Sequence, residues 1–269
     1  MKPFFDGDAY TTPPDTRRFF IDRLPLGRYA LYAKFAPIVF KARRSALSGT
    51  YDDEEWAKSS YNTMKIIEGC GGRFEITGFD TLRNLKEPVV FIANHMGTLE
   101  TLALPVLIVQ FRKATYVVKE KLVNGPIFGP VMRSRNPITV GRVDPRRDLE
   151  AVLTGGKELL ESGYSIIIFP QSTRRDVFRR SQFNSLGIKL ALHAGAGIVP
   201  VALKTDFWSN GKMHTGFGPV YRDRKIHFAF GPLMTPTGRG KSEHAAIIEF
   251  IESHLREWGG EIETPLEDA

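Results

Sequence analysis

Apolar runs of strand length alternate with amphipathic stretches of helix length through most of this chain. Five runs have the length and the β-branched content of buried strands: VVFIAN from residue 89, ATYVVK from 114, NPITVG from 136, YSIIIFP from 164 and AGIVPVAL from 196. Helical periodicity falls between them at 99–112, 146–161 and 184–195. This alternation predicts an α/β fold with a mixed, mostly parallel central sheet that is flanked by helices.

Two further helices and one strand are predicted around this alternation. Residues 52–69 open with a run of acidic side chains, which suit the positive end of a helix dipole. The stretch KIHFAFG at 225–231 is typical of a strand, and residues 242–258 have the pattern of a closing amphipathic helix. Because no internal repeat and no linker interrupts the pattern, we expect one α/β domain over residues 51–269.

The first fifty residues follow a different pattern. Residues 1–16 are expected to be irregular, and from 17 to 47 large apolar side chains mix with arginine and lysine. Pro25-Leu26-Gly27 is expected to divide this stretch, and Pro37 to kink or end the second piece. Short helices of this composition are typical of segments at a membrane interface. We therefore expect residues 1–50 to form an N-terminal amphipathic helical appendage; the alternative is that these helices pack on the domain with their arginines in water.

Charge and cysteine content narrow the classes of function. The chain of 269 residues has a net charge of +7 and a sequence pI near 9.5, which favours anionic partners. No nucleic-acid recognition motif accompanies this charge, so we expect no nucleic-acid partner. The single cysteine, Cys70, excludes an internal disulfide and is expected to be a packed thiol. No window holds the ~20 apolar residues that cross a bilayer, and we recognise no secretory signal, so we expect a soluble or membrane-surface protein.

The first of the five runs ends in Asn94-His95, and Glu100 follows five residues later. On one regular helix the side chains of His95 and Glu100 would point ~140° apart and would not meet. If His95 lies on the loop after the strand and a helix begins near Thr98, the Glu100 carboxylate reaches back to the ring. A carboxylate on one imidazole nitrogen leaves the other nitrogen to accept a proton. The sequence thus predicts a base–orienter pair at the carboxyl end of a strand; the alternative is a loop histidine beside a helix-capping glutamate.

Four blocks of the chain occur in an order that is typical of one enzyme family. They are NHMGTLE from residue 94, NPITVGR from 136, IIIFPQSTRR from 166 and GIVPVAL from 197. With these blocks the chain resembles the glycerolipid acyltransferases of the 1-acylglycerol-3-phosphate acyltransferase family over roughly residues 75–205. That family has Asn-His, four residues and an acid, then an apolar strand with an arginine, then Phe-Pro-Glu-Gly-Thr-Arg, and last an apolar strand with Val-Pro.

The resemblance implies an O-acyltransferase in which His95 is the general base and Glu100 orients its ring. Most of the glycerolipid enzymes have aspartate at the position of Glu100. An acceptor hydroxyl would attack the thioester carbonyl of acyl-CoA or acyl carrier protein, and the hydroxyl of a lysophospholipid or a related lyso-lipid is the implied acceptor. No metal and no cofactor apart from the donor is implied. Cys70 lies outside the matching blocks and is not a predicted nucleophile.

The same resemblance assigns acceptor binding to Arg142, Arg174, Thr173, Lys119, Gln171 and Ser172. Arg142 and Arg174 would hold the phosphate, since a guanidinium fork matches phosphate oxygens. Gln171 and Ser172 stand where the family has Glu and Gly, and glutamine keeps the shape of glutamate without its charge. The acceptor therefore stays open to a lyso-aminolipid or a glycolipid, and a catalytically inactive lipid-binding relative remains the other alternative.

A lipid product implies that the enzyme reaches a bilayer. The basic residues between 17 and 44 would favour anionic lipid at the membrane surface. We therefore expect a membrane-associated, cytoplasmic protein that is peripheral on the inner face of a membrane.

Overall fold

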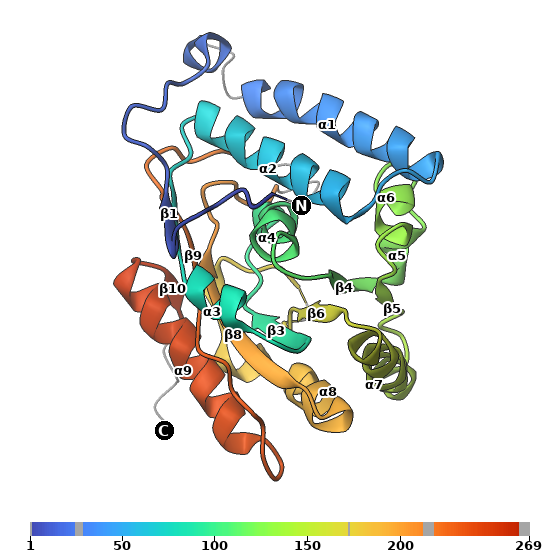
Figure 1. Ribbon diagram of the computed structural model, residues 1–269. Coiled ribbons are helices and arrows are strands. Elements are labelled where there is room, and N and C mark those ends of the chain that lie inside the picture. Colours follow the sequence, from blue (N-terminus) through green and yellow to red (C-terminus); the bar gives the residue numbers. More distant parts are fainter. Residues whose placement is uncertain (1, 25–28, 172, 212–217, 264–269) are drawn as a thin grey trace.

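The computed structural model describes residues 2–24, 29–171, 173–211 and 218–263, and Figure 1 shows how their elements are arranged. An eight-stranded sheet has the order β1-β2-β9-β8-β3-β6-β4-β5. The bounds in that order are Ala9–Thr11, Phe74–Thr77, Ile226–Phe230, Gly197–Lys204, Val89–Ala93, Ser165–Ile168, Ala114–Lys119 and Ile138–Val140. Only β1–β2 and β8–β9 pair antiparallel within this sheet. A second, two-stranded sheet joins β7 (Val177–Phe178) to β10 (Glu261–Ile262).

Helices cover both faces of the large sheet. On one face lie α1 (Ala30–Leu47), α2 (Asp53–Gly69), α4 (Leu99–Val109) and α6 (Gly129–Arg133), and on the other lie α7 (Pro145–Glu161), α8 (Leu186–Ala194) and α9 (Lys241–Glu257). The short elements are η1 (Phe20–Arg23), α3 (Phe79–Asn84), α5 (Glu120–Val123) and η3 (Arg180–Gln182). Alternate residues of β3 enter the two cores, with Phe91 on the first face and Ile92 on the second. The predicted mostly parallel α/β sheet is therefore confirmed.

The N-terminal strand and its partner were missed by the sequence pattern. Residues 9–11, expected to be irregular, form β1 at the edge of the sheet and pair with β2. Buried Glu68 on α2 secures this edge, because its carboxylate accepts hydrogen bonds from Tyr10 Oη at 2.6 Å and from Thr12 Oγ1 at 2.7 Å. Three residues are too few to display a strand period, so the expectation of an irregular lead-in is wrong for a physical reason.

The helix α1 packs against α2 and contributes Leu31 and Phe35 to the core of the first face. Pro37 lies inside α1, which continues to Leu47, so Pro37 does not end the helix. The predicted break at 25–27 lies outside the described residues. The predicted boundary near residue 50 stays a prediction, although β1 and α1 both make contacts across it. In the described part of the chain, no helix is long and apolar enough to cross a membrane.

Cys70 follows the last residue of α2 and is fully buried. Burial, with a smaller effect from nearby Asp22, raises the pKa of its thiol to about 12. The prediction of a packed thiol is therefore confirmed by its burial, and a raised pKa disfavours the thiolate, which is the reactive form.

Candidate active site

The loop that carries His95 leaves β3 in the middle of the sheet. Asn94, just before it, is 1% exposed and bonds the neighbouring strand in both directions. Its Nδ2 donates to the carbonyl of Leu203 at 2.8 Å, and its Oδ1 accepts from the N–H of Leu203 at 2.9 Å. These two bonds continue the pairing of β3 with β8 past the end of β3, so the loop begins from a fixed point.

The carboxylate of Glu100 lies in the first turn of α4 and reaches back to the ring of His95. Its Oε1 is 3.0 Å from His95 Nδ1, and the same oxygen accepts the N–H groups of Met96 at 2.7 Å and Gly97 at 2.6 Å. Its Oε2 accepts the hydroxyl of Thr205 at 2.6 Å. The predicted geometry is therefore present, and Glu100 also satisfies two backbone donors ahead of its own helix.

Glu100 is completely buried, yet its environment favours the charged form. Burial alone would raise its pKa, but the hydrogen bond and charge of His95, with the bonds from Thr205 and Gly97, hold the pKa below its usual range. A buried carboxylate that accepts several hydrogen bonds is the arrangement expected to stay ionised. Glu100 can therefore stabilise a positive charge on the ring of His95.

The ring of His95 is held by its surroundings and is 14% exposed. It stacks on Phe169 with ring centroids 4.2 Å apart and an interplanar angle of 19°. Its backbone N–H donates to Gln171 Oε1 at 2.6 Å, and its carbonyl accepts the N–H of Arg175 at 3.0 Å. With Nδ1 directed at Glu100, no described residue forms a hydrogen bond with Nε2, which leaves that nitrogen to act on a substrate.

Three cations share the edge of the sheet on which His95 lies. Lys119 ends β4, Arg142 follows β5 by two residues, and Arg174 lies in the loop after β6. Because β3, β6, β4 and β5 are parallel, all their carboxyl ends meet at this edge. Arg174 Nη1 also donates to Thr98 Oγ1 at 2.9 Å, directly in front of α4. The structure therefore brings together the predicted base and the predicted phosphate ligands.

The positive charges at this edge act on one another. Partial burial lowers the pKa of Lys119, and the charges of Arg142 and Arg174 lower it further. Burial also lowers the pKa of Arg174, against the opposing charge of Glu100. Among the described residues, none of the three side chains forms an ion pair within 4.0 Å. An anion with several negative charges would stabilise such a cluster of cations most.

The other predicted residues differ in their surroundings. Gln171 is 2% exposed, and its side-chain oxygen accepts the backbone N–H of His95, so it helps to fix the loop that carries His95. Thr173 is exposed, and its hydroxyl donates to the carbonyl of Arg174 at 3.2 Å. Ser172 lies outside the described residues. Sequence reasoning missed Thr205, because its approach to Glu100 depends on the pairing of β8 with β3.

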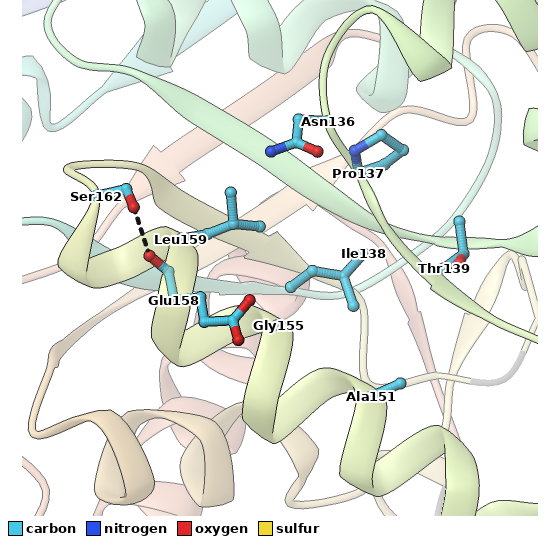
Figure 2. A pocket seen from close by; sticks show the side chains of 9 residues that line it. All are labelled: Asn136, Pro137, Ile138, Thr139, Ala151, Gly155, Glu158, Leu159 and Ser162. Atoms are coloured by element: carbon cyan, nitrogen blue, oxygen red, sulfur yellow. Dashed lines mark hydrogen bonds between the residues drawn. The ribbon is translucent and has the colours of Figure 1, made fainter.

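A surface pocket of about 400 Å³ lies elsewhere, between β5 and α7 (Figure 2). Asn136 and Pro137 line it and precede β5, so this pocket is at the amino end of the strand, away from His95. Of the residues that line the pocket, Ser162 donates its hydroxyl to the backbone carbonyl of Glu158 at 2.7 Å. The pocket holds none of the predicted site residues.

Comparisons with known proteins show that this chain is similar to acyltransferases. The family model described as Acyltransferase matches residues 73–204. A 1-acyl-sn-glycerol-3-phosphate acyltransferase of Pseudomonas aeruginosa is 26% identical over 210 residues, which are 78% of this chain and 77% of that protein. A chloroplastic 1-acyl-sn-glycerol-3-phosphate acyltransferase of Arabidopsis thaliana, LPAT1, is 28% identical over 174 residues, which are 63% of this chain and 48% of that protein.

One solved structure has the same fold. The crystal structure of the 1-acyl-sn-glycerophosphate acyltransferase PlsC from Thermotoga maritima aligns with a TM-score of 0.58 and 17% sequence identity. The alignment covers 88% of this chain and 92% of that chain, so the likeness extends over most of the fold.

Proposed function

We propose, from the premise that this chain belongs to the glycerolipid acyltransferase superfamily and is an acyltransferase, that it acylates the free hydroxyl of a lysophospholipid. The observation that carries the proposal is the position of His95 Nε2. It is the ring nitrogen of His95 that has no hydrogen-bond partner among the described residues, and it lies at the same sheet edge as Lys119, Arg142 and Arg174. One molecule with a hydroxyl near an anionic group fits both features.

In the proposed reaction His95 Nε2 takes the proton of the acceptor hydroxyl as its oxygen attacks the thioester carbonyl. The C–O ester bond forms, the C–S bond breaks, and the proton on His95 passes to the leaving thiolate. Glu100 stabilises the imidazolium between these steps through the contact at Nδ1. A hydroxyl is a weak nucleophile near neutral pH, and a positioned base accelerates such a step typically by ~10²- to 10⁴-fold.

The acceptor's phosphate is proposed to bind the three cations. Arg142 and Arg174 offer guanidinium forks, which bind phosphate oxygens in pairs, and Lys119 adds a point charge. Each lacks an ion pair among the described residues, so a phosphate would not need to displace a carboxylate. The curated relatives carry 1-acyl-sn-glycerol-3-phosphate in their names, and we propose an acceptor of that class.

The donor and the location complete the proposal. The donor is an acyl thioester, either acyl-CoA or acyl carrier protein, and no metal or further cofactor is proposed. We also propose that the protein is peripheral on the cytoplasmic face of a membrane, through the basic and apolar segment 17–44. Phe20 is 77% exposed and Phe40 is 61% exposed on this segment, which supports contact with lipid.

The test is mass spectrometry of the lipids that the purified protein forms from mixed lyso-lipids with acyl-CoA and with acyl carrier protein. A doubly acylated phospholipid that is missing with His95→Ala supports the proposal. If products form only from a lyso-aminolipid or a glycolipid, the acceptor belongs to that class and is not a lysophospholipid. Failure to form any product with either donor, while lyso-lipid still binds, would show a binding protein instead of an enzyme.

A further inference from the structure

The turn that follows β5, with the first residues of α7 (together Gly141–Arg147), exposes an apolar side chain beside the candidate active site. Val143 is 92% exposed, the highest value among the large apolar residues described. Arg142, just before it, has a backbone φ of 60°, a left-handed conformation that is costly for a residue with a side chain. The turn thus presents Val143 to solvent at a cost in backbone strain.

Two carboxylates fix this turn. Asp148 accepts the N–H of Gly141 at 2.8 Å with one oxygen and the N–H of Arg142 at 2.7 Å with the other. Asp144 caps α7 by accepting the N–H groups of Arg146 at 2.9 Å and of Arg147, the next residue. Both acids are therefore engaged with the backbone, and neither forms an ion pair with an arginine side chain of the turn. The backbone around Val143 is therefore fixed by hydrogen bonds, and the neighbouring arginines, Arg142 before it and Arg146 and Arg147 after it, form no ion pair with these acids.

Exposed apolar side chains continue from this turn to α1. The helix α5 adjoins the turn, because a Cβ added to Gly141 would lie 3.8 Å from Glu120 Oε2. The same helix carries Leu122, which is 39% exposed. The loop from α5 to α6 carries Ile127, which is 45% exposed, and its neighbour Pro126 accepts a hydrogen bond from Arg43 of α1 at 3.0 Å. Figure 1 shows α1, α6 and α5 following one another along one side of the molecule.

The face of α1 at this end has the same character. Phe40 and Leu47 are 61% and 59% exposed, and seven residues of helix bring them to nearly the same direction. Exposed Lys41 and Arg44 lie on the same helix, as exposed Lys121 does on α5. Exposed Glu120 on α5 is an acid on this surface, in addition to the two engaged aspartates. The surface is thus apolar at its centre and mainly basic around it.

We propose that the β5–α7 turn is a second lipid contact, which docks the edge of the active site onto an anionic bilayer together with α1 and α5. Val143 enters the interface, and Arg146 and Arg147 bind lipid headgroups. An apolar residue within a basic border matches a surface with acidic headgroups above acyl chains. This inference rests on the proposed lipid acceptor. If Val143 enters the bilayer interface, its neighbour Arg142 lies at the depth of the lipid headgroups.

The test is co-sedimentation of the full chain with vesicles of phosphatidylcholine and phosphatidylglycerol in equal parts, and with vesicles of phosphatidylcholine alone. Val143→Asp should weaken binding to the mixed vesicles by about tenfold, the effect of keeping a valine side chain out of the apolar interface. Val143→Trp should strengthen it. Arg146→Gln and Arg147→Gln should each weaken binding to the mixed vesicles by about fivefold and leave the weaker binding to phosphatidylcholine unchanged.

The matched control is Leu233→Asp. Leu233 is 52% exposed and lies against Gly197 at the amino end of β8, the opposite edge of the sheet. Equal binding by Val143→Asp and the parent overturns the inference, as does an equal loss with Leu233→Asp. A change of oligomeric state caused by Val143→Asp without lipid, measured by sedimentation velocity, also overturns it, because the turn would then contact a second copy. Vesicle binding requires no turnover, so these results are independent of the proposed reaction.

Discussion

The two ends of the candidate active site are built in opposite ways. At β3 the side chain of Glu100 is completely buried, and its two oxygens accept four hydrogen bonds. At β4 and β5 the side chains of Lys119 and Arg142 are exposed and form no ion pair among the described residues. At the first end the hydrogen bonds of the carboxylate are satisfied without a ligand. At the second end like charges lie close together, and an anionic ligand would stabilise them.

This difference matches two proposed functions, proton transfer at the first end and headgroup binding at the second. A proton acceptor needs one orientation at all times, which a saturated hydrogen-bond network supplies. A site for an anionic headgroup needs unpaired charge, which is tolerable only where water reaches it. Changes at the first end should therefore act mainly on kcat, and changes at the second end mainly on the KM of the acceptor.

The largest expected effect comes from removing the proposed base, His95. His95→Ala should lower kcat by roughly 10²- to 10⁴-fold with little change in acceptor KM, because proton removal is lost while the cations remain. Steady-state acyl transfer from a labelled donor measures both constants. His193→Ala, at an exposed position on α8, is the control and should leave both unchanged. A His95→Ala variant with parental kcat would remove the proposed role of the ring.

The next effect comes from the hydroxyl that holds Glu100. Thr205→Val keeps the shape but removes the donor to Oε2, so kcat should fall roughly ten- to a hundredfold. Without that donor the carboxylate binds protons more readily, and the acid limb of the kcat/KM profile should move to higher pH. Thr205→Ser restores the donor and should restore both the rate and the profile. A slower Thr205→Val enzyme with an unchanged pH profile would mean that Thr205 only supports the fold.

A smaller effect is expected at the cationic end. Arg142→Met should raise the KM for a phosphate-bearing lyso-lipid by roughly tenfold and leave kcat nearly unchanged, because one charged contact is lost. The matched comparison is a monoacylglycerol, which has the hydroxyl without the phosphate. If Arg142→Met impairs both acceptors equally, the proposed division between the two ends is wrong.

The smallest effect concerns stability. The folded state depresses the pKa of Glu100, so its contribution to the free energy of unfolding is present above the ordinary pKa of about 4.5. This contribution is lost as pH falls from that value through the folded pKa. Urea unfolding at a series of acidic pH values should show the loss in the parent and a flatter dependence in Glu100→Gln. Parallel curves for the two proteins would contradict the depressed pKa.

Much of the sheet was predictable because buried parallel strands are continuous apolar runs. Strand β4 occupies Ala114–Lys119, the residues of the run ATYVVK, and α7 begins within one residue of the predicted helix. The edge strand β1 and its neighbour β2 were not predictable in this way. For β1, three residues without a period gain their strand conformation from hydrogen bonds to β2, more than sixty residues away in the chain.

The sequence by itself determined the order of the central strands and the main helices along the chain, the position of His95 at a strand end, and the reach of Glu100 from the first helical turn. These depend on local periodicity and on the geometry of a few consecutive residues. Only the tertiary structure decided that Thr205 holds the far oxygen of Glu100, that Gln171 binds the backbone of His95, and that Val143 stands exposed beside Arg142. The reason is that strand order in the sheet sets which loops meet at one edge, and this order depends on pairing between distant segments.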